Sequence, residues 1–522
     1  MNEVFASLAF SAVIALALAV LLRHFGLSIA LPLIAAGALV ALSPWGPDAL
    51  PDPEIVLVAI LAPLVFGEAL SSSFLDLRKV SRQVLLLAIG LVVATTVVVG
   101  GVAVWIAAMP LAAALALGAV LAPTDAVAVS TVAKKASLPR RVISILEGES
   151  LVNDGTGLTA LRVAVAAAIV GSVTLLEVGE IFALAVVVGV GIGALSGVLL
   201  SQVLRRTRDA VASNALILVA PFAIYLGTEH LEGSGILAVV VAALWIAHAQ
   251  HSEPGSSGRL QATYVWKHIT FIFQAVAFFC IGLEFPDVFG RLPDGQLPLV
   301  PGLVASVLLA LILTRFVFVF GILGVTPQYR KVDAWGRAGL VIAWAGARGP
   351  VSGLAAFSIP LTVAAGTDFP FRDVILATTF SIIVITLLLS LTIAPLARAL
   401  KIKGEDNSSE VHRIDTMLAR AALERLDAII AEAEITENPL DPEVIQRLRD
   451  DALARIERAE DARESRVDEH DANQQRVSVS LSMVHAEQSE LIRIRDEEGV
   501  PDALIRPIMR DLDVRAEALE AR

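Results

Sequence analysis

The chain has 522 residues, of which 56% are hydrophobic, and its mean hydropathy is +0.74. These values exclude an ordinary water-soluble globular protein and are typical of a polytopic membrane protein. The net charge of −12 is unevenly distributed: residues 1–397 contain 21 Lys/Arg and 22 Asp/Glu, whereas residues 398–522 contain 19 and 30. The sequence therefore predicts a nearly neutral membrane domain over 1–400 and an acidic, cytoplasmic helical region over 401–522.

Apolar runs of about 20 residues, the length that crosses the hydrocarbon core of a bilayer, recur along the first three-quarters of the chain. They are separated by charges, Pro and Gly, and they predict an all-α protein with thirteen membrane-spanning helices. The approximate ranges are 4–22, 26–42, 54–70, 84–107, 111–134, 141–170, 178–204, 211–230, 233–250, 263–285, 298–322, 335–360 and 371–400. An acidic rather than basic N-terminal stretch favours a first spanning helix over a cleaved signal peptide.

Basic residues alternate between the two sets of loops that join these helices. Sixteen lie in loops that follow odd-numbered helices, whereas the opposite loops contain only Arg291 and Arg372. The positive-inside rule places the first set in the cytoplasm. We therefore expect the N-terminus outside the cell and the C-terminal region inside it.

Two of the predicted helices contain sequences that disfavour a continuous helix. The fifth contains LAPTDAVAVS (121–130) with Pro123, and the twelfth contains AWAGARGPVSG (343–353), with three glycines and Pro350. If the seventh helix is a linker, the other twelve form two sets of six with opposite orientation. Both interruptions then fall in the fifth helix of a set. Such inverted repeats with broken helices indicate a transporter whose ion site lies near the bilayer midplane.

Five ionisable residues lie deep in the predicted helices, although a charge at this depth is costly and usually functional. They are Asp125, Glu149, Asp154, Arg315 and Arg348. At about 1.5 Å of rise per residue, Glu149 and Arg315 lie about 12 Å and about 10 Å from the cytoplasmic ends of their helices. Opposite charges at a matching depth predict a structural ion pair. The alternative is that Arg315 lines an aqueous funnel alone.

Asp125 and Arg348 fall near the centres of the two interrupted helices. Asp125 has two possible roles, as an N-cap for the second half of its helix and as a cation ligand, and one does not exclude the other. Arg348 would offset the negative C-terminal ends of the half-helices that meet there. Thr124 offers a hydroxyl or a carbonyl oxygen to a cation.

Asp154 lies near the middle of the sixth helix, and its neighbour Asn153 is neutral, so this pair has one titratable group. A carboxylate removed from water needs either a proton or a small cation, and it cannot hold both. Oxygen ligands from Asp154, Ser150, Thr124 and released backbone carbonyls suit Na⁺ or Li⁺, whereas no Cys/His cluster suits a transition metal. Competition for one carboxylate, combined with alternating access, predicts electroneutral antiport. The structural alternative is a polar stripe that only packs against neighbouring helices.

Several other polar residues lie nearer the ends of their helices. Glu68 in FGEAL lies near the cytoplasmic end of the third helix, where it either lines a funnel or reaches the interface without a functional role. Glu147 is similarly close to the interface. Arg162 lies toward the outer end of the sixth helix, where snorkelling of its side chain suffices. Cys280 is the single cysteine, so the chain has no disulfide framework.

Four motifs occur together in one order: PTDAVAVS, GESLVNDGTG, LTRFVFVF and GARGPVSG. Over about residues 5–400 this set resembles the sodium/proton exchangers of the monovalent cation:proton antiporter-1 family, with bacterial NhaP-like and animal NHE-type members. The resemblance implies a NhaA-like fold with thirteen helices, crossed broken helices 5 and 12, and a homodimer. It also implies a bridge between Glu149 and Arg315.

The same resemblance assigns the ion and the proton to Asp154. It places Asn153, Asp125, Thr124 and Ser150 around that carboxylate, which implies Na⁺ at Asp154, Asp125, Thr124 and Ser150. In this family an Asn-Asp pair instead of Asp-Asp marks the electroneutral branch. Ala126 departs from the pattern, because many relatives have Pro there, and the interruption in this chain rests on Pro123.

The C-terminal region begins with the polar stretch GEDNSSE and continues with helical apolar spacing in MLARAALERLDAIIAEAE and IRPIMRDLDVRAEAL. This spacing predicts a small helical module. The module either regulates the protein, mediates its dimerisation, or only keeps it solvated. Residues 490–519 resemble the tail ending of bacterial members, which implies a bacterial cytoplasmic (inner) membrane.

The leading hypothesis is therefore an electroneutral Na⁺(Li⁺)/H⁺ antiporter that acts in pH homeostasis. Its expected partners are Na⁺ or Li⁺, protons, the lipid bilayer and a second copy, with no nucleic acid and no cofactor. The chain has no nucleophile–base constellation, so we expect no enzyme activity. K⁺/H⁺ antiport is an alternative, because the site residues do not define cation size. A gated cation channel, which would carry current, is the alternative from another class.

Overall fold

The computed structural model describes residues 2–44, 57–125, 139–170, 175–207, 209–251, 257–293, 295–325, 333–363, 367–402, 408–435, 441–464, 469–498 and 502–520. Within these ranges every regular element is a helix, apart from an isolated bridge between Thr362 and Asp368. The chain divides into two compact units, Met1–Glu405 and Asp406–Arg522.

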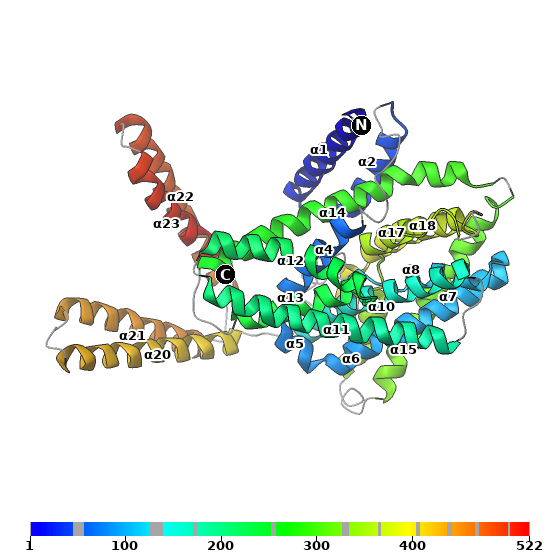
Figure 1. Cartoon of the computed structure of the whole chain (residues 1–522). Helices are drawn as coiled ribbons and strands as arrows, with labels where there is room; N and C mark the ends of the chain where they lie inside the picture. Colours follow the sequence, from blue (N-terminus) through cyan, green and yellow to red (C-terminus); the bar gives the residue numbers. More distant parts are fainter. Residues whose placement is uncertain are drawn as a thin grey trace. The chain divides into compact units, whose positions relative to one another are not determined.

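The first unit is a bundle of helices (Figure 1). Its first half contains α1 (Asn2–His24), α2 (Ala30–Ala41), η1 (Leu57–Leu61), α4 (Ala62–Ser71), α5 (Phe74–Lys79), α6 (Ser81–Leu85), η2 (Leu86–Leu91), α7 (Val92–Ala107) and α8 (Leu111–Leu121). Its second half contains α10 (Arg140–Val170), α11 (Leu175–Arg206), α12 (Ala210–His230), α13 (Gly235–His251), α14 (Ser257–Arg291), α15 (Leu299–Val325), α16 (Asp333–Trp344), α17 (Pro350–Phe357), α18 (Arg372–Ser390) and α19 (Ile393–Ala399).

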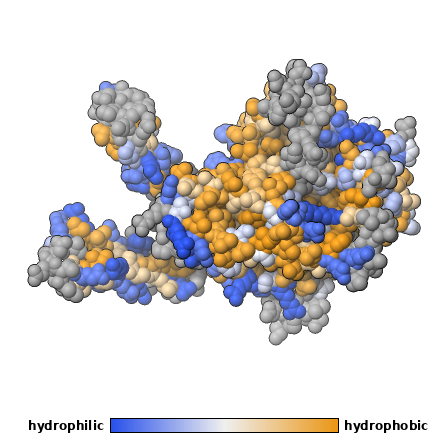
Figure 2. All heavy atoms as spheres, viewed as in Figure 1, coloured by the Kyte–Doolittle hydropathy of each residue, from blue (hydrophilic) through white to orange (hydrophobic). Residues whose placement is uncertain are grey.

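The described part of every predicted spanning range contains helical residues. By length and hydropathy, six helices in the described residues are able to cross a membrane: Ser81–Ala107, Gly179–Arg206, Val211–His230, Ala262–Arg291, Leu299–Gly321 and Arg372–Ala399. Shorter apolar helices, such as Ala30–Ala41 and Leu111–Leu121, accompany them. The face of the unit that Figure 2 shows is largely apolar, and Trp105 and Val317 are 84% and 74% exposed. Such a surface suits lipid rather than water.

Close helix packing depends on small residues at crossing points, as is usual in membrane proteins. Gly37 of α2 lies directly against the backbone of α14 at Phe279 and Gly282, so that an added Cβ would overlap the Phe279 carbonyl oxygen. The large side chains Phe66, Leu117 and Phe380 are fully buried in the same core. The packing therefore holds α2, α4, α8, α14 and α18 together around the centre of the unit.

Both predicted interruptions coincide with non-helical backbone near that centre. Helix α8 ends at Leu121, and Pro123–Asp125 are non-helical. The second half of this predicted helix lies in 126–138, outside the described residues. Helices α16 and α17 are separated by non-helical Ala345–Gly349. The Asp125 backbone N–H donates a 2.8 Å hydrogen bond to the Ala347 carbonyl, so the two interruptions meet. The number of crossings and the inverted repeat stay predictions.

The second unit contains α20 (Ser408–Ile435), α21 (Pro442–Glu464), α22 (Glu469–Glu498) and α23 (Asp502–Glu520). Helices α20 and α21 form one hairpin, and α22 and α23 form another. The second hairpin has a small apolar core of Val484, Leu491, Ile505 and Leu512. The region is helical as expected, while its cytoplasmic location and its role stay predictions.

Candidate ion-binding site

A small cavity lies where α4, the segment 123–125, α10 and the start of α17 meet. The residues that line it are Glu68, Pro123, Thr124, Asp125, Ser150, Asp154, Gly349, Pro350, Val351 and Ser352. Four of the predicted ligands, Asp154, Asp125, Thr124 and Ser150, are thus brought to one place from segments far apart in the sequence. Non-helical backbone at Pro123–Asp125 and at Gly349 also lines the cavity.

Helix α10 supplies Asp154 and Ser150. They are four positions apart, so both project from one face of a continuous helix. Each is only 3% exposed. Gly157, one turn further on, lies against the ring of Pro123, where an added Cβ would overlap the ring. This close approach positions the face of α10 that bears Asp154 beside the non-helical segment.

Thr124, Asn153 and Glu149 form a buried chain of hydrogen bonds. The Asn153 Nδ2 amide donates to Thr124 Oγ1 over 2.9 Å, and this hydroxyl donates to Glu149 Oε1 over 3.0 Å. One lone pair of the Thr124 hydroxyl therefore remains for a ligand. Asn153 itself does not line the cavity. Its contact with the site is the hydrogen bond to Thr124, which fixes the orientation of that hydroxyl.

The predicted ion pair between Glu149 and Arg315 is present in the structure. Arg315 Nη1 lies 2.5 Å from Glu149 Oε1, and Nη2 lies 2.9 Å from Oε2, with side-chain exposures of 4% and 1%. The guanidinium also donates from Nε to the Ile342 carbonyl (3.1 Å) and from Nη2 to the Ala345 carbonyl (3.2 Å). Arg315 thus joins α10 and α15 to the C-terminal end of α16, whose carbonyls lack helical partners.

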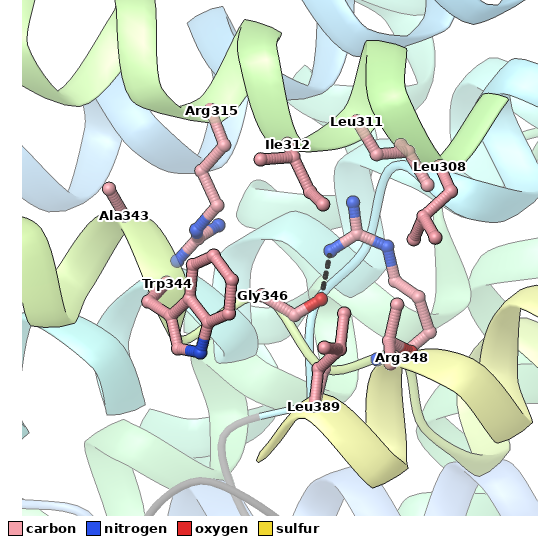
Figure 3. A pocket seen from close by; sticks show the side chains of 11 residues that line it. Leu308, Leu311, Ile312, Arg315, Ala343, Trp344, Gly346, Arg348 and Leu389 are labelled. Atoms are coloured by element: carbon pink, nitrogen blue, oxygen red, sulfur yellow. Dashed lines mark hydrogen bonds between the residues drawn. The ribbon is translucent and has the colours of Figure 1, made fainter. Parts of the chain in front are cut away.

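Arg348 lines a second cavity, shown in Figure 3, rather than the first. Its Nη1 donates to the Gly346 carbonyl over 3.1 Å, and its backbone N–H donates to Thr386 Oγ1 over 3.0 Å. The charge therefore lies at the negative C-terminal end of α16, where the helix dipole favours a cation. Arg315 lines the same cavity (Figure 3).

Gly349 lines the first cavity and shows how tightly the two non-helical segments pack. An added Cβ at Gly349 would overlap the carboxylate of Asp125. Residue 349 also immediately precedes α17, which begins at Pro350. Only a residue without a side chain fits between Asp125 and the start of this helix.

Three carboxyl side chains, those of Glu68, Asp125 and Asp154, face the first cavity, and no Lys or Arg is among its described lining residues. Three carboxylates in a site of low polarity cannot all remain ionised by themselves. Either a cation binds between them, or at least one of them takes up a proton. No group of three His, Cys, Asp or Glu side chains in the described part of the chain has the spacing of a metal cluster. A cation here would therefore also need hydroxyl and carbonyl oxygens.

Two lining residues and one ion pair were not assigned from the sequence. Glu68, for which a funnel position and a non-functional position were both open, lines the cavity. Ser352 was not singled out, although it lies four residues after Arg348 in GARGPVSG. Arg162 pairs with Glu229 over 2.5 Å. Pairing, rather than snorkelling alone, accounts for its position.

Comparison with known proteins identifies the family. Residues 9–399 match the transmembrane domain of sodium/hydrogen exchangers. The chain belongs to the sodium/hydrogen exchanger family. The predicted resemblance is confirmed, and this exchanger is a multi-pass membrane protein of a transporter family rather than of an enzyme family.

The exchanger is similar to two bacterial relatives over most of its length. It is 31% identical over 499 residues to an uncharacterised Na⁺/H⁺ exchanger of Mycobacterium tuberculosis, covering 92% of this chain and 90% of that one. It is 33% identical over 430 residues to a sodium, potassium, lithium and rubidium/H⁺ antiporter of Bacillus pumilus, covering 78% and 63%. These similarities support cation/proton antiport.

The fold of the exchanger is similar to that of the sodium proton antiporter MjNhaP1 from Methanocaldococcus jannaschii. The TM-score is 0.64 at 17% sequence identity, over 77% of this chain and 99% of that one. At this identity the similarity shows the fold alone. The predicted all-helical antiporter fold is therefore confirmed in its general architecture.

Proposed function

We propose that this protein is an electroneutral Na⁺(Li⁺)/H⁺ antiporter in which Asp154 binds a cation and a proton in alternation. The observation that carries the proposal is the cavity where Asp154, Asp125, Thr124 and Ser150 converge beside non-helical backbone at Pro123–Asp125 and Gly349. These are hard oxygen ligands, which suit alkali cations. Their burial makes an empty, fully ionised site unfavourable.

The chemistry of exchange follows from one shared carboxylate. When Na⁺ enters, its charge replaces the proton on Asp154, and the proton leaves to the same side. When Na⁺ leaves on the other side, a proton takes its place. One Na⁺ moves against one H⁺, so no net charge crosses. Asn153 is neutral, so the Asn153–Asp154 pair exchanges one proton for one Na⁺. The Asn153 amide also holds Thr124 in place.

The neighbouring charges have structural roles in this scheme. Glu149 and Arg315 neutralise each other and hold α10 against the end of α16. Arg348 compensates the same helix end from the second cavity. Neither arginine lines the cavity that contains Asp154, so neither competes with the transported cation there.

The setting is also part of the proposal. The chain would span a bacterial cytoplasmic membrane with thirteen helices in inverted repeats, crossed at broken helices 5 and 12. It would work as a homodimer, with its N-terminus outside and residues 401–522 in the cytoplasm. The loop charges support this orientation, and the interrupted helices support alternating access around a central site.

K⁺/H⁺ antiport is the second candidate function. The Bacillus pumilus relative is named for sodium, potassium, lithium and rubidium, so its similarity does not restrict the cation to Na⁺. A gated cation channel is the candidate from another class. Channel activity generates a voltage, whereas one-for-one exchange does not.

The decisive experiment measures cation-driven proton flux and membrane voltage in proteoliposomes. Wild type should release protons on addition of Na⁺ or Li⁺, with no change in voltage. Asp154→Asn should abolish this flux. Thr156→Val is the matched control on α10, because Thr156 donates its hydroxyl proton to the Val152 carbonyl and does not line the cavity.

Two results would count against the proposal. Retained exchange in the Asp154→Asn variant would show that another group binds the ions. A voltage that follows the cation gradient would exclude electroneutral exchange. A larger response to K⁺ than to Na⁺ would favour the second candidate function.

A further inference from the structure

Buried hydroxyls in the helices of this protein are usually satisfied by their own helix. Thr96, Thr159 and Thr228 donate to the carbonyl four residues earlier, over 2.8, 2.7 and 2.7 Å. This bond is the common way for Ser and Thr to be accommodated inside a helix. Hydroxyls of this kind have no proton left to donate elsewhere.

Ser352 does not have this option because of its position. It is the third residue of α17, which begins at Pro350. The residues three and four positions earlier, Gly349 and Arg348, belong to the non-helical segment. Ser352 is 1% exposed, and within the described part of the protein its Oγ has no hydrogen-bond partner. A buried hydroxyl without a partner is unfavourable unless a ligand satisfies it.

Three more buried hydroxyls share this property in the described residues, those of Ser11, Thr378 and Thr379. None of them lines the cavity that contains Asp154, whereas Ser352 does. The unsatisfied hydroxyl is therefore placed beside three carboxyl groups in a site with no Lys or Arg among its described lining residues.

We propose that the Ser352 hydroxyl is a ligand of the transported cation and helps to determine which cation is accepted. The inference rests on the proposed antiport. A hydroxyl has one proton and two lone pairs, so Ser352 can donate to a carboxylate in the cavity while a lone pair binds the cation. Because this ligand is neutral, it leaves the one-for-one charge balance unchanged.

Ser352 affects the discrimination between cations of different size because it stands on a different helix from Asp154 and Ser150. Asp154 and Ser150 stand on α10, whereas Ser352 stands on a second helix, α17, that lines the same cavity. A cation bound by both helices must match the distance between them. Removing the ligand on α17 relaxes that requirement, and enlarging the side chain tightens it.

The experiment compares Ser352→Ala, Ser352→Cys and Ser352→Thr in proteoliposomes, with KM and kcat measured separately for Na⁺, Li⁺ and K⁺. Ser352→Ala and Ser352→Cys, which lack a hard oxygen, should raise the KM for Na⁺ about tenfold at a nearly unchanged kcat. Ser352→Thr keeps the oxygen and adds a methyl group, so it should raise the KM for K⁺ more than the KM for Li⁺.

Ser358→Ala is the matched control. Ser358 caps the other end of α17, donates its hydroxyl proton to the Ala355 carbonyl over 2.8 Å, and does not line the cavity. This variant should leave the KM values and the order of cation preference unchanged. KM values for the three Ser352 variants that equal those of Ser358→Ala would overturn the proposal.

A binding measurement separates this inference from the proposed function. Thermal unfolding of purified protein in detergent is followed at increasing Na⁺, because a ligand that binds the folded state raises the unfolding temperature. Ser352→Ala should need about tenfold more Na⁺ for the same rise. Absence of exchange in wild type would refute antiport, whereas an unchanged Na⁺ dependence in Ser352→Ala would refute the role of Ser352 alone.

Discussion

The ion pair between Glu149 and Arg315 provides a quantitative test of how α10 is held. Arg315→Ala removes two hydrogen bonds to Glu149 and two to the carbonyls of Ile342 and Ala345. Glu149 then keeps a buried charge that, among the described side chains, still accepts a hydrogen bond from the Thr124 hydroxyl. Breaking a buried pair by removing one partner typically destabilises a protein by about 3–5 kcal/mol. We expect a loss of this size for Arg315→Ala.

The double variant Glu149→Leu/Arg315→Met tests the reason for this loss. If the single substitution is harmful because it leaves an unpaired buried charge, removal of both charges should destabilise the protein less than the sum of the two single changes. Arg315→Lys should be intermediate, because Lys keeps the charge but lacks the planar fork that reaches both carboxylate oxygens.

The assay is thermal or denaturant unfolding in detergent, followed by tryptophan fluorescence. Arg291 and Glu284 supply a matched control: they pair over 3.1 Å, with side-chain exposures of 49% and 19%. Breaking this exposed pair should destabilise by less than about 1 kcal/mol. The reasoning is refuted if Arg315→Ala is no more harmful than this control, or if the two single effects simply add.

Two further predictions concern packing and pH. Gly349→Ala should reduce exchange, because its Cβ would overlap the Asp125 carboxylate; proton flux in proteoliposomes checks this, and wild-type flux would contradict it. On the short helix α5, burial raises the pKa of Asp76, but the hydrogen bond from Lys79 and the charges of Arg140 and Lys79 outweigh it and hold the pKa below the ordinary 3.8. A lowered pKa stabilises the folded state above the ordinary pKa, and this contribution is lost as pH falls through the folded value. Asp76→Asn should therefore lower the unfolding temperature slightly at neutral pH and have no effect in strong acid, and an equal effect at both would refute the assignment.

The sequence by itself determined the class of protein and its main helices. Apolar runs of about 20 residues match the thickness of a bilayer and are rare in water-soluble domains, so the helix ranges follow from length and hydropathy. Depth along a helix is also readable from the sequence, because each residue adds a known rise. Matching depth and opposite charge were enough to pair Glu149 with Arg315, and the structure contains that pair.

The sequence grouped Asp154, Asp125, Thr124 and Ser150, but tertiary structure alone decided which further side chains share their cavity. Depth says nothing about the direction in which a helix face points or which distant segment meets it. Glu68 and Ser352 therefore entered the site only through the packing of α4 and α17. For the same reason Asn153 was found behind Thr124, and Arg348 in the neighbouring cavity. These positions depend on helix rotation and on contacts between segments that lie tens to hundreds of residues apart, which no local pattern encodes.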